Sequence, residues 1–220
     1  PSQSSAASDV YKRQFESCLL HSFIHTQGHI EILGLLWTSM DLLFHAVVGA
    51  AIGECAPKRI QHRQLKGVAG ALLPDLANLP SYLYLGMKTN STLWYPTPEA
   101  FYNNEWIVNH PTWAVWYLSH SLLFWAIVVV PLFRYAKWEH LLSIAYLSHL
   151  LLDLPSHTGI WGMAPFWPYP MLVDGWFDAW AWGPGTIFTY ALIPAALWAL
   201  ARAMDVSSWW TKDAPATQAS

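Results

Sequence analysis

Apolar residues gather in five segments of the chain, and polar or proline-rich stretches separate these segments. We interpret each segment as a helix. Since a helix that spans a bilayer needs about 20 predominantly apolar residues, the first and fourth segments are short for a span. The pattern predicts an all-α fold, a multi-pass integral membrane helical bundle of about five apolar helices. The segments lie at residues 41–55, 67–86, 112–133, 139–154 and 182–203.

Prolines and serines predict where these helices break. Pro74 and Pro80 lie inside the second segment, and a proline in a helix interior removes a hydrogen bond and clashes with the preceding turn. We therefore expect the second helix to be broken. We expect the third segment to be one helix, and Pro155 to end or kink the fourth.

Composition supports a membrane protein. Hydrophobic residues make up 54% of the chain and charged residues only 11%, whereas a soluble domain carries about 25% charged residues. The net charge of −3 is too small to indicate a nucleic-acid partner, and we expect none. Cys18 and Cys55 are the two cysteines, which excludes a disulfide framework and a thiolate metal site.

The N-terminal residues are expected to be separate from the membrane domain. Residues 9–14, Asp-Val-Tyr-Lys-Arg-Gln, resemble the translation of a transposon adapter used in sequencing libraries. We expect residues 1–39 to be a non-native or dispensable leader, with 1–14 adapter-like, and Met40 to be the start. The alternative is that 30–52 forms one continuous span. Residues 40–204 would then form the membrane domain, and 205–220 a polar tail.

Lysine and arginine gather in alternate loops, which predicts an orientation. The two long loops, 88–111 and 155–181, contain one lysine and no arginine. Cytoplasmic loops carry the excess of basic residues, so the long loops are expected outside, with their tryptophans along the outer interface. The basic residues of the other loops are Lys58, Arg59, Arg63, Lys66, Arg134, Lys137, Arg202 and Lys212.

Histidine and aspartate side chains from four segments converge on the outer half of this predicted bundle. His149 and Asp153 are one helical turn apart, so their side chains leave the same helix face. An uncompensated carboxylate inside a membrane helix costs about 2.5–3.5 kcal/mol, and a metal or a histidine partner compensates it. The donor set suits one or two divalent ions, with zinc or manganese expected and Asp75 or Asp153 as a candidate general base. The candidate ligands are His45, Asp75, His120, His149, Asp153 and His157.

Two of these residues have ordinary alternatives. A single histidine on an apolar helix, such as His45, is usually a satisfied core residue. Asp75 follows Pro74 and could instead begin a helix as its N-cap.

The ordered motifs resemble the YdjM-like family of bacterial and archaeal membrane-bound metal-dependent hydrolases. The resemblance covers about residues 40–175 and implies a multi-pass cell-membrane protein with a divalent-metal hydrolase site. Two features depart from the family: Ala77 and Asn78 stand where many members have a second aspartate, and the arginine common before Ser-His-Ser is absent. The motifs are His45, Gly70-Ala71-Leu72-Leu73-Pro74-Asp75, Ser119-His120-Ser121, Ser148-His149 with Asp153, Pro155-Ser156-His157 and Pro165-Phe166-Trp167-Pro168.

The sequence thus predicts a membrane-embedded hydrolase that acts on an ester or phosphoester, with a lipid or lipid-linked substrate reaching the site from the outer leaflet. Two other classes stay open. An ion- or proton-binding transporter also buries His and Asp beside broken helices, and a structural membrane protein uses such groups as interhelical hydrogen bonds. The oligomeric state is not predicted.

Overall fold

The computed structural model describes residues 42–89, 100, 105–136 and 140–211, apart from the side chains of Glu105, Ile160, Trp180, Pro184 and Thr211. The predicted leader, 1–39, lies outside these residues, as does most of the alternative first span. Within the described part the chain forms helices and no strand, with one isolated bridge between Met163 and Val173. The all-α prediction is confirmed.

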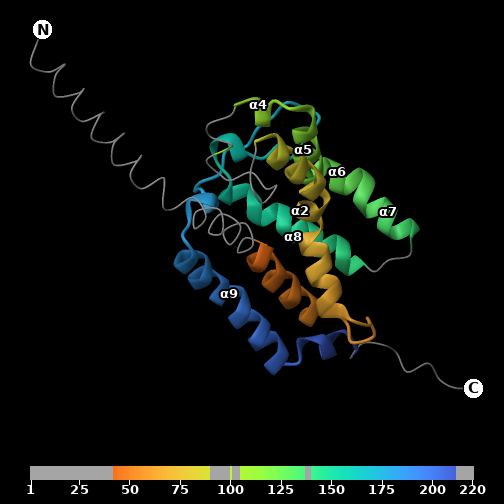
Figure 1. Cartoon of the computed structure of the whole chain (residues 1–220). Helices are drawn as coiled ribbons and strands as arrows, with labels where there is room; N and C mark the ends of the chain where they lie inside the picture. The colour runs from red at the N-terminus through yellow and green to blue at the C-terminus, as the bar shows by residue number, and fades with distance from the viewer. Residues whose placement is uncertain (1–41, 90–99, 101–104, 137–139, 212–220) are drawn as a thin grey trace, which may run out of the picture.

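Helices occupy all five predicted segments (Figure 1). The first is Leu42–Cys55, and the second is α2, Arg63–Lys88. The fourth is α8, His140–Ser156, which ends one residue after Pro155, and the fifth is α9, Pro184–Ala203. The third segment consists of a 3-10 turn, Pro111–Trp113, then α5 (Ala114–Ser119), α6 (Leu122–Phe124), a π-helical turn (Trp125–Val129) and α7 (Val130–Tyr135). A short helix, α4 (Glu105–Val108), precedes it.

The break falls in the third segment and not in the second, contrary to both predictions. The chain bends by 63° between Pro111–Ser119 and Leu122–Tyr135. Ser121 explains the break, because it leaves the helical conformation and its hydroxyl caps the next helix, accepting from the Phe124 amide at 3.2 Å. The Pro165 carbonyl accepts from the Leu123 amide and from the Ser121 hydroxyl, each at 3.1 Å, which further satisfies the broken backbone.

By contrast, α2 continues through both Pro74 and Pro80 over 26 residues. Proline is tolerated inside membrane helices when neighbouring groups satisfy the backbone that it disturbs. Close packing against α8 provides such neighbours on the Pro74 side. Asp75 therefore lies inside a helix, and the N-cap alternative is wrong.

Glycines bring the first helix against α2 at backbone contact. A Cβ atom added at Gly67 would lie 2.0 Å from the Gly49 carbonyl oxygen, and one added at Gly49 would lie 2.5 Å from the Gly67 carbonyl oxygen. Farther along α2, a Cβ at Gly70 would lie 2.5 Å from the Leu142 carbonyl oxygen of α8. Small residues allow membrane helices to approach in this way, and here they position α2 between the other two helices.

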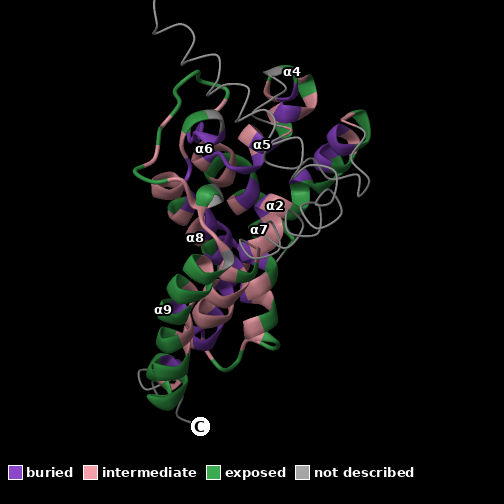
Figure 2. Cartoon of the chain, turned by 60° about the vertical axis from the view of Figure 1, so that its left-hand side comes forward, coloured by how far each residue is buried: buried purple, intermediate pink, exposed green. Residues whose placement is uncertain are grey.

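Buried side chains concentrate around α2, α5 and α8, whereas α9 is largely exposed (Figure 2). An aromatic core lies at the end of the bundle where the long loop 155–181 packs, called the loop end below. It contains Trp113, Trp116 and Trp161. Trp161 was predicted to lie along the membrane interface, but it is 1% exposed inside this core. Large apolar side chains instead remain exposed on the outer faces of the helices, where a bilayer would cover them. Examples are Ile127, Leu132, Ile144, Leu151 and Phe188.

Length and composition identify one span clearly in the described part. Gly185–Ala203 is long and apolar enough to cross a membrane. The bent pair Pro111–Ser119 and Leu122–Tyr135 passes the same test only if its two parts are counted as one span, and Leu42–Cys55 is apolar but shorter.

The opposite end of the bundle is joined by polar contacts that sequence analysis missed. Glu54 is 5% exposed, and its carboxylate accepts from Arg63 Nη2 at 2.7 Å and from Gln64 Nε2 at 2.6 Å. The segment predicted as a polar tail begins with a 3-10 turn, Val206–Thr211, whose Trp210 indole donates to the Cys55 carbonyl at 2.7 Å. Residues 212–220 lie outside the described part.

Candidate metal centre

The six predicted ligands lie close together at the loop end of the bundle, although they come from four segments. His45 extends from the first helix, Asp75 from the middle of α2, and His120 from the break after α5. His149 and Asp153 lie one turn apart on α8, and His157 follows its end. Asp75 has a 26% exposed side chain, whereas the other five residues are at most 3% exposed.

Two histidine nitrogens and two carboxylates form the centre of the cluster. His149 Nε2 lies 3.3 Å from His120 Nε2. Asp153 Oδ2 lies 2.9 Å from His149 Nε2 and 3.7 Å from His120 Nε2. Asp75 Oδ1 lies 3.7 Å and 3.4 Å from the same two nitrogens. Each carboxylate therefore has one oxygen within 3.7 Å of both histidine Nε2 atoms.

His45 and His157 flank this centre through Asp153. His45 Nε2 lies 3.1 Å from Asp153 Oδ1, and its ring stacks on the His149 ring at 3.8 Å between centroids. His157 Nδ1 is more distant, 4.0 Å from Asp153 Oδ1, and it lies 3.2 Å from the Asp153 backbone carbonyl. His45 therefore contacts the carboxylate directly, whereas His157 lies at the edge of the cluster.

Backbone carbonyls determine which nitrogen of each central histidine carries a proton. His149 Nδ1 lies 2.7 Å from the Ala71 carbonyl oxygen, and His120 Nδ1 lies 2.9 Å from the Trp116 carbonyl oxygen. Since a carbonyl only accepts, His149 Nδ1 must donate. His120 Nδ1 also lies 2.9 Å from Ser119 Oγ, but that hydroxyl donates its proton to the Trp116 carbonyl at 3.2 Å, so His120 Nδ1 donates as well. In the neutral rings the Nε2 atoms then present lone pairs to each other and to two carboxylates. Such an arrangement needs a cation, either an additional proton or a metal ion.

The donor set and its spacing fit a divalent metal. Two donor atoms on one tetrahedral zinc ion lie roughly 3.3 Å apart, given Zn–N bonds of about 2.0–2.1 Å. The His–His distance and the four His–Asp distances among His120, His149, Asp75 and Asp153 range from 2.9 to 3.7 Å. Asp75 Oδ2 is buried without a hydrogen-bond partner among the described residues, as are both amide atoms of Asn78, one turn farther along α2. Imidazole and carboxylate donors suit zinc and manganese.

Five of the six candidate ligands fall into two overlapping groups of three, and His157 belongs to neither group. His45, His149 and Asp153 form one, and Asp75, His120 and His149 form the other. Because His149 Nε2 has a single lone pair, it can bind only one ion. This arrangement favours one metal with several available donors over two metals that share His149.

Trp116 is the residue of the site that sequence analysis missed. Its indole stacks on the His120 ring at 4.8 Å between centroids, and its carbonyl accepts from His120 Nδ1. The spacing of four between Trp116 and His120 was the available signal, since residues one turn apart lie on one helix face. The Ala71 carbonyl could not be anticipated, because any residue supplies the same backbone group.

The fold and site define an all-α protein with a buried histidine and aspartate cluster inside helices that carry an apolar outer surface. Residues 40–212 match the model of the YdjM inner membrane protein family. The match covers well over half of the chain, so the chain belongs to this family, and the family resemblance is confirmed to that extent. No curated protein and no solved structure is significantly similar to the chain. Membership identifies a protein of the inner membrane, in contact with the lipid bilayer.

Proposed function

We propose that the chain is a membrane-embedded hydrolase that uses one divalent metal, zinc or manganese, to cleave an ester or phosphoester. The observation that supports it best is the pair of histidine Nε2 atoms, 3.3 Å apart, with both Nδ1 atoms close to backbone carbonyls. When bound, such a metal lowers the pKa of a coordinated water towards neutrality and polarises the bond to be cleaved. His120, His149 and Asp153 would hold it, with His45 and Asp75 available as further ligands.

The two carboxylates have different surroundings, which suggests different roles. Asp153 is 3% exposed and contacts several histidines, so we assign it to metal binding. The Asp75 side chain is 26% exposed, and its Oδ2, which is itself buried, has no hydrogen-bond partner among the described residues. This oxygen can accept the proton of the attacking water, so we assign Asp75 as the general base.

Turnover of simple esters tests this proposal. Purified protein with Zn²⁺ or Mn²⁺ should hydrolyse p-nitrophenyl butyrate or bis(p-nitrophenyl) phosphate, and chelation should abolish the reaction. Asp75→Asn should lower kcat by about 10²–10⁴-fold, the usual contribution of a general base, and still bind metal. A metal-loaded wild type that cleaves neither substrate would contradict the hydrolase assignment.

One alternative keeps the same contacts without a metal. His149 Nε2 and Asp153 Oδ2 are 2.9 Å apart, which also fits a protonated histidine paired with a carboxylate in a structural core. Metal content separates the two possibilities. The transporter alternative expected buried His and Asp beside a broken helix. The second helix is continuous, but the third segment bends by 63° beside His120, so ion flux in liposomes is the measurement that separates this alternative from the hydrolase.

We also propose that the helices form a multi-pass bundle with the basic loops in the cytoplasm and the metal centre in the outer half of the membrane. In a chain with Cys18 and Cys55 replaced by serine, Leu172→Cys should react with an impermeant maleimide in intact spheroplasts. Gln61→Cys, exposed in the basic loop, should react only after lysis. The opposite pattern would place the metal centre in the cytoplasmic half.

A further inference from the structure

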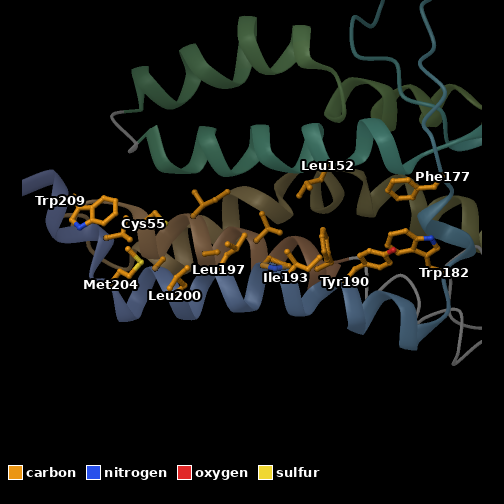
Figure 3. A pocket seen from close by; sticks show the side chains of 17 residues that line it. Cys55, Leu152, Phe177, Trp182, Tyr190, Ile193, Leu197, Leu200, Met204 and Trp209 are labelled. Atoms are coloured by element: carbon orange, nitrogen blue, oxygen red, sulfur yellow. The ribbon is translucent and has the colours of Figure 1, made fainter.

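A long apolar groove lies between the first helix and α9, and the proposed function does not yet use it. Its volume is about 1040 Å³, at the upper end of the range of about 300–1,000 Å³ for small-molecule sites. None of the described residues that line it is charged. Figure 3 shows the lining side chains in a row from Trp182 and Phe177 at one end to Met204 and Trp209 at the other.

The groove exists because α9 does not pack closely on the bundle. Pro194 and Ala201 are its only buried residues among those whose side chains are described. Ile193 and Leu197 face the groove and are each 58% exposed. The helix therefore presents an apolar face that its own bundle leaves partly uncovered.

One end of the groove meets the metal centre. A smaller cavity of about 120 Å³ is lined by His45 and Asp153. It shares part of its wall with the groove, namely Phe44, Leu152, Phe177 and Trp182. A molecule that occupies the groove therefore has one end beside two of the candidate metal ligands.

We propose that the groove binds one hydrocarbon chain of a membrane lipid, with the lipid's ester or phosphoester at the end lined by His45 and Asp153. The placement of the cleaved bond rests on the proposed function; the binding of the chain does not. The lipid would be cleaved by water, which adds its hydroxyl to the acyl or phosphoryl group and its proton to the departing alcohol.

The length of the groove and its membrane setting favour a hydrocarbon chain as its occupant. Tyr190 and Met204 mark a stretch of α9 about 20 Å long at 1.5 Å per residue. One leaflet of the hydrocarbon core is about 15 Å thick, so a lipid chain has a comparable length. The chain belongs to an inner membrane protein family, so lipid hydrocarbon surrounds this uncharged groove and can enter it without a second protein.

Photolabelling tests the occupant. Wild-type protein is treated with a chelator to remove metal, so that the lipid is not cleaved, and is placed in nanodiscs. The nanodiscs contain a phospholipid that carries a diazirine at the end of one acyl chain. The label should attach to Leu200 and Met204, at the end of the groove away from the metal centre. The larger side chain of Leu197→Trp fills the groove and should reduce this labelling about tenfold. A tenfold loss corresponds to about 1.4 kcal/mol, which is within the range that overpacking costs. Ala51→Phe, on the facing wall, repeats the test should Leu197→Trp misfold.

Leu192→Trp is the matched control. Leu192 lies on α9, is 52% exposed and does not line the groove, so its substitution should leave the labelling unchanged. Equal loss in Leu192→Trp and Leu197→Trp, or labelling that neither groove variant changes, would overturn the proposal. Crosslinking of the groove to protein in place of lipid, whether to a second copy or to residues 1–41, would also overturn it.

Ester length separates failure of this inference from failure of the proposed function. Leu197→Trp should lower kcat/KM for p-nitrophenyl palmitate about tenfold and leave that for p-nitrophenyl butyrate unchanged. If labelling behaves as expected but neither ester is cleaved, the binding of a lipid chain in the groove is supported and the hydrolase proposal is contradicted. If p-nitrophenyl butyrate is cleaved but the groove variants change neither the labelling nor the turnover of p-nitrophenyl palmitate, the hydrolase proposal is supported and the binding of a lipid chain in the groove is contradicted.

Discussion

Replacing Asp153 with asparagine should abolish tight metal binding. Asp153 Oδ2 contacts His149 and His120, and Oδ1 contacts His45, so one carboxylate joins three of the candidate ligands. Asparagine keeps the shape of the side chain but removes its charge. Loss of an outer partner of a metal ligand costs about 10–100-fold in affinity, and loss of a ligand should cost more. Competition with a chromophoric Zn²⁺ chelator measures the change in purified protein.

Matched substitutions make this result specific. His149→Ala should cause a similar loss, because it removes the nitrogen common to both ligand groups. Asp174→Asn changes an exposed carboxylate in the loop after α8, and His62→Ala and His140→Ala remove exposed histidines. These three variants should keep wild-type affinity. Equal affinity in Asp153→Asn and Asp174→Asn would show that the cluster is not the metal site.

Gly67→Ala should strongly destabilise the helical bundle. The added Cβ atom would lie 2.0 Å from the Gly49 carbonyl oxygen, and a backbone atom cannot move aside as a side chain can. Overpacking usually costs about 1–3 kcal/mol, and contact with backbone favours the upper part of that range. The first helix must move away from α2 and carries His45 with it. Thermal unfolding in detergent should therefore show a lower Tm, and metal affinity should fall.

Gly185→Ala provides the control for that substitution. A Cβ atom added at Gly185 meets nothing within 4 Å, and alanine favours helix over glycine. This variant should be as stable as the wild type or slightly more stable. If Gly67→Ala were equally stable, the close contact between the first helix and α2 would be wrong.

The sequence predicts the helical segments and the close approach of the candidate side chains well; that these side chains bind a metal stays a prediction. Apolar runs identified five helices, and the spacing of four between His149 and Asp153 placed both side chains on one face. Convergence of His45, Asp75 and His120 on that face followed from matching their depths in the predicted helices. The structure brings all three within 3.7 Å of another candidate ligand.

Helix breaks and packing partners depend on tertiary contacts, and the sequence predicts them less well. Proline suggested a break in α2, but packing against α8 supports the helix through Pro74. Ser121 ends the helix before it, because its hydroxyl caps the next turn and also donates to the Pro165 carbonyl, 44 residues away. Glu54 pairs with Arg63 across the turn between the first two helices, a contact that periodicity does not reveal.

Metal content and coordination of the wild-type protein test the central claim most directly. Protein purified without chelator and resupplied with Zn²⁺ or Mn²⁺ should contain one metal per chain by elemental analysis. For the zinc form, X-ray absorption should show nitrogen and oxygen donors at about 2.0–2.2 Å with imidazole scattering and no sulfur. Protein that remains metal-free after resupply, or a zinc bound through sulfur, would contradict the metal centre and favour a hydrogen-bonded structural cluster.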